Sequence, residues 1–197
     1  MDYAVLDQEE LFQLALQAME SQQHAEAVAL LKQGVRNDGE DARLRYLLGA
    51  EYAQIGLFDR AVVEMEQAVA LQPGLVMAVF QLGLLHLTQG QPDRAEQAWQ
   101  GLGELAEDHP LQLFRQGLLH LIRDEFADCR EYLTRGIAAN QAAPMLNEDM
   151  RRILVQIDAQ QGAGSEAPMV EAEPAAGASA GNLLLRGYAS SGDDKLH

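Results

Sequence analysis

Residues 79–87 read VFQLGLLHL and residues 113–121 read LFRQGLLHL, so two apolar nonapeptides 34 residues apart agree at six of nine positions. When the two stretches are aligned on Gly83 and Gly117, a further step of 34 residues towards the N-terminus reaches Gly49. Self-similarity at a fixed period of this length predicts an array of repeated units. The period divides the chain without a gap into four windows, which are residues 8–41, 42–75, 76–109 and 110–143.

The second window carries the most complete pattern: a Leu-Gly pair, an aromatic residue three positions later, small residues in the second half and a closing proline. These residues are Leu48, Gly49, Tyr52, Ala61, Ala68 and Pro73. In this pattern the chain resembles the tetratricopeptide repeat family, whose units are pairs of helices. The third window keeps Leu82, Gly83, Ala95 and a large aromatic residue, Trp99. The first and fourth windows are more degenerate, as expected for the end units of a solenoid.

The resemblance covers about 136 of the 197 residues and implies an all-α fold, a right-handed α-solenoid of helix-turn-helix repeats. Each window contains two apolar-periodic segments long enough for amphipathic helices. Gly56 and Gly90 mark the turn between the two helices, where a left-handed backbone is favourable for glycine. Gly101 and Gly103 lie inside one predicted helix and cost it about 1 kcal/mol each relative to alanine. We therefore expect this helix to be loose or to end early.

Four further segments flank the repeats. Residues 1–7 form an N-terminal lead, and residues 144–161 carry an apolar stripe backed by charges, which predicts a capping helix over the last repeat. Residues 162–182 are small, proline-bearing and acidic, which predicts a flexible linker. Residues 183–197 form an apolar tail segment. Its apolar side chains are Leu183, Leu184, Leu185 and Tyr188.

The composition disfavours several classes of partner and compartment. Thirty acidic residues against fourteen basic ones give a net charge of −16, which repels nucleic-acid backbones and anionic lipid surfaces. The acidic N-terminus lacks the basic and apolar regions of a secretory signal, and no uncharged apolar run is long enough to span a bilayer. Cys129 is the only cysteine, which excludes an internal disulfide. We expect a cytoplasmic protein without nucleic-acid or membrane partners.

The histidines and the cysteine are the candidate catalytic or metal-binding groups. His86 and His120 occupy the same position in successive repeats, so their side chains are expected to point in parallel instead of converging on one metal ion. We expect each to pack between helices with one hydrogen bond. A Cys129–His120 dyad is the catalytic alternative, but a cysteine where the repeat favours a small residue is typical of a core position. The sequence therefore predicts no enzyme, no metal site and no cofactor.

An aromatic residue recurs at position 5 of each window, on the helix face that lines the concave groove in the tetratricopeptide repeat family. Positions 9 and 12 continue this face with leucine, methionine or alanine, whereas carboxylate-gripping relatives carry amide and basic side chains there. Two explanations of the recurring aromatic residue are open. The repeat family often prefers an aromatic residue at this position whatever the function. Alternatively, these side chains form an exposed apolar groove that a partner covers. The predicted groove residues are Phe12, Leu16, Met19, Arg43, Tyr46, Ala50, Phe80, Leu84, Leu87, Phe114, Leu118 and Leu121.

The predicted function is a non-enzymatic protein–protein interaction module, a scaffold, adaptor or chaperone, that binds an apolar peptide or an amphipathic helix in this groove. In architecture and charge the chain resembles the small bacterial chaperones of type III secretion translocators. The predicted occupant of the groove is a segment of another protein, a second copy of the chain, or the chain's own tail. The alternative for the tail is that it is disordered and that its leucines are a short recognition motif for something else, or have no role. In the alternative function, the chain is an accessory subunit of an enzyme or of a secretion or pilus machine and docks through its acidic convex surface.

Overall fold

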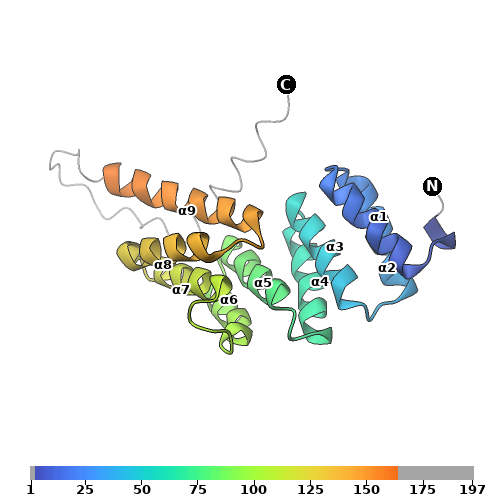
Figure 1. Cartoon of the computed structure of the whole chain (residues 1–197), viewed down its shortest axis with the longest axis horizontal. Coiled ribbons are helices and arrows are strands. Elements are labelled where there is room, and N and C mark those ends of the chain that lie inside the picture. Colours follow the sequence, from blue (N-terminus) through green and yellow to red (C-terminus); the bar gives the residue numbers. More distant parts are fainter. Residues whose placement is uncertain (1–2, 164–197) are drawn as a thin grey trace, which may run out of the picture. The chain divides into compact units, whose positions relative to one another are not determined.

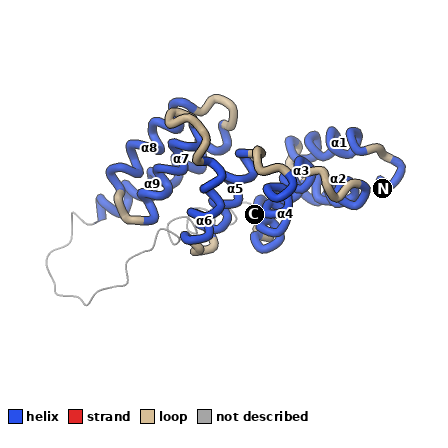
Figure 2. The backbone as a smooth tube through the Cα atoms, turned by 90° about the horizontal axis from the view of Figure 1, so that it is seen from below, coloured by secondary structure: helices blue, strands red, loops and turns tan. Residues whose placement is uncertain are grey.

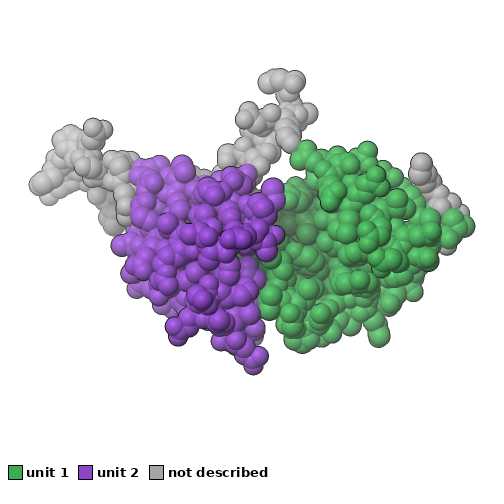
Figure 3. All heavy atoms as spheres, viewed as in Figure 1, with its two compact units in different colours: residues 1–85 green, residues 86–197 purple. Residues whose placement is uncertain are grey.

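The computed structural model describes residues 3–163, and all secondary structure in this range is helical (Figure 1, Figure 2). The predicted tail residues Leu183, Leu184, Leu185 and Tyr188 lie outside the described residues, as does nearly all of the predicted linker. The chain divides into two compact units, residues 1–85 and 86–197, which are coloured separately in Figure 3. The all-α repeat fold predicted from the sequence is confirmed.

In the first unit, consecutive helices pack on one another from α1 to α4: α1 on α2, α2 on α3 and α3 on α4. The unit boundary falls inside α5. The helices of this unit are η1 (Tyr3–Val5), α1 (Gln8–Glu20), α2 (His24–Asn37), α3 (Ala42–Gln54), α4 (Phe58–Leu71) and the greater part of α5 (Val76–Thr88).

The second unit has α7 packed on α8, and α8 packed on α9. Its helices are α6 (Pro92–Ala98), η2 (Trp99–Leu102), α7 (Pro110–Ile122), α8 (Phe126–Ala139) and α9 (Pro144–Ala163). The helix predicted to be loose is indeed short: α6 ends at Ala98 and gives way to one 3₁₀ turn, whereas α4 and α8 each run for 14 residues. This is consistent with the helix-weakening effect of Gly101 and Gly103.

Specific side chains begin several of the helices. Asp7 accepts a hydrogen bond from the Glu10 backbone amide while the Glu10 carboxylate accepts one from the Asp7 amide, a reciprocal capping box. Asp41 caps α3 by accepting from the amides of Arg43 and Leu44. Such caps satisfy amides that have no partner inside the helix. They also fix where α1 and α3 begin, the helices that carry the predicted groove residues of the first two windows.

The turn inside each helix pair repeats the same backbone geometry four times. Four residues spaced by 34 positions have positive φ, namely Gln22 (56°), Gly56 (76°), Gly90 (71°) and Asp124 (58°). At every turn the following amide binds the carbonyl five residues before it. These bonds are Gln23 to Ala18, Leu57 to Tyr52, Gln91 to His86 and Glu125 to His120, all between 2.8 and 3.0 Å. This is the Schellman arrangement of a helix end. The sequence predicted it at the two glycines and missed it at Gln22 and Asp124.

Replacing Gln22 with glycine is expected to raise the free energy of unfolding by about 0.5–1 kcal/mol, because a side chain at positive φ is strained and glycine is not. Gly56→Ala is the matched opposite change and should lower it by about 1 kcal/mol. Denaturant unfolding followed by far-ultraviolet circular dichroism measures both. A Gln22→Gly protein less stable than the parent would contradict the assignment of this turn.

Candidate functional site

The predicted groove residues of the first two windows, residues 8–41 and 42–75, lie on two neighbouring helices and are only partly covered. Phe12, Leu16 and Met19 are separated by four and three positions on α1 and are all half-buried. Tyr46 and Ala50 are half-buried on α3. This spacing places each set on one side of its helix. We call these five residues, with Arg43 at their edge, the α1–α3 face. The adjacent positions Leu11, Ala15, Ala18, Leu44 and Leu48 are buried in the unit.

Arg43 connects the two helices of the α1–α3 face. Its guanidinium carbon lies 4.8 Å from the centroid of the Phe12 ring, a cation–π distance, and its Nη2 donates to Asp41 Oδ2 at 2.9 Å. Burial alone would raise the pKa of the Asp41 carboxyl, but the hydrogen bonds from Arg43 and its charge outweigh burial and hold this pKa below its usual value. Arg43 is therefore engaged with its own helix start and with Phe12, which agrees with the sequence argument that it forms no carboxylate clamp.

The predicted groove is not an exposed ladder along the whole chain. Phe80 and Phe114 have no exposed surface, and the leucines assigned to the same face are buried with them. The expectation of exposed rungs on these helices is therefore wrong. The buried members are Phe80, Leu84, Leu87, Phe114, Leu118 and Leu121.

A close approach of two helices explains the burial of Phe114. The Phe114 ring lies against Gly136 of α8, where a Cβ atom would stand 2.5 Å from the ring atoms Cδ1 and Cε1. The aromatic side chain thus packs against the second helix of its own pair. In α5, every residue between Ala78 and Thr88 except Gln81 is buried. The sequence signal for this was the lack of any Asp, Glu, Lys or Arg in α5, since a helix that is apolar on all sides is typically buried.

The two histidines of the opening repeat each bond within their own turn. His86 Nδ1 lies 3.3 Å from Gln91 Oε1, and His120 Nδ1 lies 2.6 Å from Glu125 Oε2. His86 is buried, and the His120 ring stacks on Tyr132 with 5.2 Å between centroids. Each histidine therefore has a hydrogen-bonding partner five positions later, which confirms the packing role with a hydrogen bond.

Cys129 is fully buried, and burial raises the pKa of its thiol to about 12, an effect that the nearby Arg130 charge only partly opposes. A thiol with this pKa stays protonated near neutral pH, whereas the thiolate is the nucleophilic form. His120 Nδ1 is engaged by Glu125. This geometry does not support a Cys129–His120 catalytic dyad.

A buried carboxylate in the first unit was missed by the sequence analysis. Glu51 of α3 is only 2% exposed, and its Oε2 lies 2.9 Å from Nδ1 of His24 at the start of α2. The equivalent positions of the third and fourth windows are Leu85 and Leu119. A glutamate at a position that is leucine in the third and fourth windows was the available signal. The pair joins the first helix pair to the second.

Comparison with known proteins identifies the repeat. Residues 42–74 match the family model described as tetratricopeptide repeat. Residues 42–74 are therefore a tetratricopeptide repeat, and the rest of the described chain is built of helix pairs of the same kind. Because this repeat is a protein-binding scaffold, the tetratricopeptide repeat chain is a protein-interaction scaffold in general terms. No functionally curated protein is significantly similar to it in sequence.

Several solved structures share the fold of this tetratricopeptide repeat protein. A crystal structure of MamA is 22% identical with a TM-score of 0.58, covering 68% of this chain and 78% of the other. MamA from Desulfovibrio magneticus RS-1, from residue 41 to the end, is 19% identical with a TM-score of 0.54, covering 95% and 97%. At this level of identity the likeness concerns the fold. Within residues 3–163, no helix of the tetratricopeptide repeat protein is long and apolar enough to cross a membrane.

Proposed function

We propose that this tetratricopeptide repeat protein is a non-enzymatic adaptor that binds an apolar segment or an amphipathic helix of another protein on the α1–α3 face. The observation that carries the proposal is the half-burial of Phe12, Leu16, Met19, Tyr46 and Ala50 on two neighbouring helices. Apolar side chains left partly in water on one face release free energy when a partner covers them, about 25 cal/mol for each Å². Helices and extended segments commonly use such faces.

The chemistry of the α1–α3 face favours an apolar partner over an acidic one. Its only cation, Arg43, already binds Asp41 and stacks on Phe12. The chain as a whole carries a net charge of −16, which repels an acidic peptide at long range. A partner segment with apolar residues at helical spacing and with basic residues at its edges is the best match. We place this function in the cytoplasm.

The experiment compares partner recovery by the full chain and by surface variants. The double variant Leu16→Glu/Tyr46→Glu is expected to keep the helical circular dichroism spectrum and to lose at least about 90% of the partner recovered from cell extract, because two charges would be buried under the partner without ion pairs. The control is Val63→Glu on α4, where the side chain is 49% exposed and lies off the α1–α3 face. This control should recover the partner normally.

Two outcomes separate the proposal from its alternatives. Equal partner recovery by the double variant and by the control would show that the partner does not bind the α1–α3 face. If the double variant is destabilised, the milder Leu16→Ala/Tyr46→Ala pair keeps good helix formers and should still weaken recovery. A complex that dissociates as salt rises above about 0.15 M would favour docking through the acidic surface, since screening weakens exposed charge contacts and not apolar ones.

A further inference from the structure

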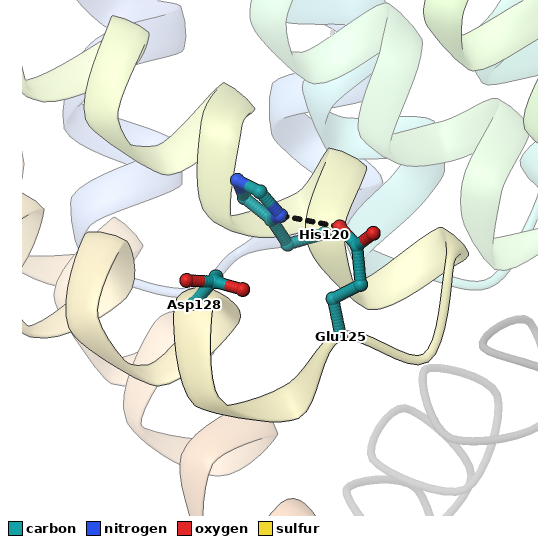
Figure 4. A group of neighbouring side chains, drawn as sticks. All are labelled: His120, Glu125 and Asp128. Atoms are coloured by element: carbon teal, nitrogen blue, oxygen red, sulfur yellow. Dashed lines mark hydrogen bonds and ion pairs between the residues drawn. The ribbon is translucent and has the colours of Figure 1, made fainter.

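Three metal-ligating side chains gather at the turn between α7 and α8, outside the α1–α3 face (Figure 4). His120 lies near the end of α7, Glu125 precedes α8, and Asp128 lies in its first turn. One ligand atom from each residue lies within 4.8 Å of the other two. His120 Nδ1 and Glu125 Oε2 are already 2.6 Å apart. An imidazole and two carboxylates thus surround one small volume.

The backbone of the turn holds this cluster in place. Asp124 has φ of 58°, and the Glu125 amide donates to the His120 carbonyl at 3.0 Å, which brings the side chains of residues 120 and 125 to the same side of the turn. Tyr132, one turn further along α8 than Asp128, stacks on the imidazole with an interplanar angle of 14°. The imidazole orientation is therefore fixed before any ligand binds. The side chains of His120 and Glu125 are 22% and 44% exposed, which leaves a side of the cluster open to solvent.

In the two preceding repeats, the position equivalent to Asp128 is an arginine. In the second repeat, the Arg60 guanidinium carbon lies 5.9 Å from the centroid of the Tyr52 ring. In the third repeat, Arg94 donates to Gln91 Oε1 at 3.1 Å, and Gln91 is the partner of His86. Tyr52 and His86 are the counterparts of His120, and Arg60 and Arg94 are the counterparts of Asp128.

The fourth repeat reverses the charge of this position. Asp128 replaces the arginine, and Glu125 replaces the neutral Gln91 of the third repeat. The second helix of each of these repeats has an acidic residue in its first turn. This residue is Asp59 in the second repeat and Asp93 at the equivalent position of the third, but in the fourth repeat it is Asp128, one position later. One residue is about 100° of helix rotation, so the acid faces the histidine instead of the solvent-facing side. Among residues 3–163, Asp128 has no ion pair and no side-chain hydrogen bond.

We propose that His120, Glu125 and Asp128 bind a divalent transition-metal ion of the Zn²⁺ type, which takes the electrostatic place that arginine has in the preceding repeats. Imidazole nitrogen and carboxylate oxygen are ligands that such ions prefer, and water can complete the coordination on the open side. Two atoms that are each about 2.1 Å from an ion lie at most about 4.2 Å apart. In tetrahedral coordination two such atoms are about 3.4 Å apart, so the exposed carboxylates have to close by up to about 1.4 Å.

The test titrates Zn²⁺ into the full chain, stripped of metal with a chelator, by isothermal titration calorimetry. We expect one specific site per chain, with the affinity lowered at least about tenfold by Asp128→Asn and further by His120→Gln, because each removes one ligand. Asp128 is exposed and has no partner to lose, so Asp128→Asn keeps the fold. His86→Gln, at the equivalent position of the third repeat, is the matched control and should bind Zn²⁺ as the parent does.

A spectroscopic readout locates the ion independently of affinity. Co²⁺ in place of Zn²⁺ should give visible absorption bands in the parent and in His86→Gln, and none in the variant Glu125→Gln/Asp128→Arg, which carries the residues of the third repeat. The proposal is overturned if the chain binds no Zn²⁺, or if the ligand variants bind it as tightly as the parent. The second result would mean that the acidic surface at large binds the ion.

Discussion

Replacing Phe114 with alanine is expected to lower the free energy of unfolding by about 3–5 kcal/mol, the range for a large aromatic side chain removed from a core. Phe114 has no exposed surface and packs on Gly136 of the neighbouring helix. Phe12, at the equivalent position of the first repeat, is half-buried, so Phe12→Ala should cost only about 1 kcal/mol. The comparison separates a core position from a surface position at one and the same place in the repeat.

The measurement for Phe114 is denaturant unfolding followed by tryptophan emission. Trp99 is the only tryptophan and is fully buried in the same unit as Phe114, so its emission reports the unfolding of that unit. The corresponding Phe12 variant is followed by circular dichroism. If both variants lose a similarly small amount of unfolding free energy, Phe114 is not a core residue, and the predicted row of exposed aromatic residues would extend to it.

A methyl group added at Gly136 is expected to destabilise the second unit by about 1–3 kcal/mol, although alanine is the better helix former. A Cβ atom at this position would stand 2.5 Å from two Phe114 ring atoms and 3.4 Å from Leu113 Cβ. The ring has to shift, and overpacking of this kind costs more than the gain in helix propensity, which is about 1 kcal/mol. Trp99 emission during denaturant unfolding measures the effect.

Two controls make this second prediction specific. Gly74→Ala introduces a methyl group with no atom within 4 Å and should leave the free energy of unfolding unchanged or slightly raised. In a Phe114→Leu background, Gly136→Ala should cost clearly less, because the smaller side chain leaves room for the methyl group. An additive double-mutant cycle, or a Gly136→Ala protein more stable than the parent, would show that the two side chains do not meet.

The repeat architecture was predictable from the sequence because the residues that recur every 34 positions are ones that the fold requires in most repeats. Gly83 and Gly117 set the period, Gly56 and Gly90 supply two of the four left-handed turns, and the glycines after Trp99 coincide with the shortened helix. Gln22 and Asp124 adopt the same turn without glycine. Their conformation follows from the helices on both sides of them and not from their own preference, so local sequence could not reveal it.

The binding surface was only partly predictable. A repeat position assigns a residue to a face of its helix, but the neighbouring residues decide whether that face is covered. Phe12 lies under the guanidinium of Arg43, whereas its counterpart Phe114 turns onto Gly136. The buried Glu51 depends on His24, 27 residues away and on another helix. Such long-range pairings follow from packing, which an internal alignment of repeats does not contain.

The most direct measurement of the central claim replaces Tyr46 with the photo-reactive residue benzoylphenylalanine and irradiates the full chain in cell extract. Val63 on α4 carries the same group in the control protein. If the α1–α3 face binds a partner, position 46 forms a covalent adduct with an apolar or amphipathic segment of another protein, identified by mass spectrometry, and position 63 does not. An adduct of equal yield from both positions, or a crosslink only within the chain itself, would contradict the claim.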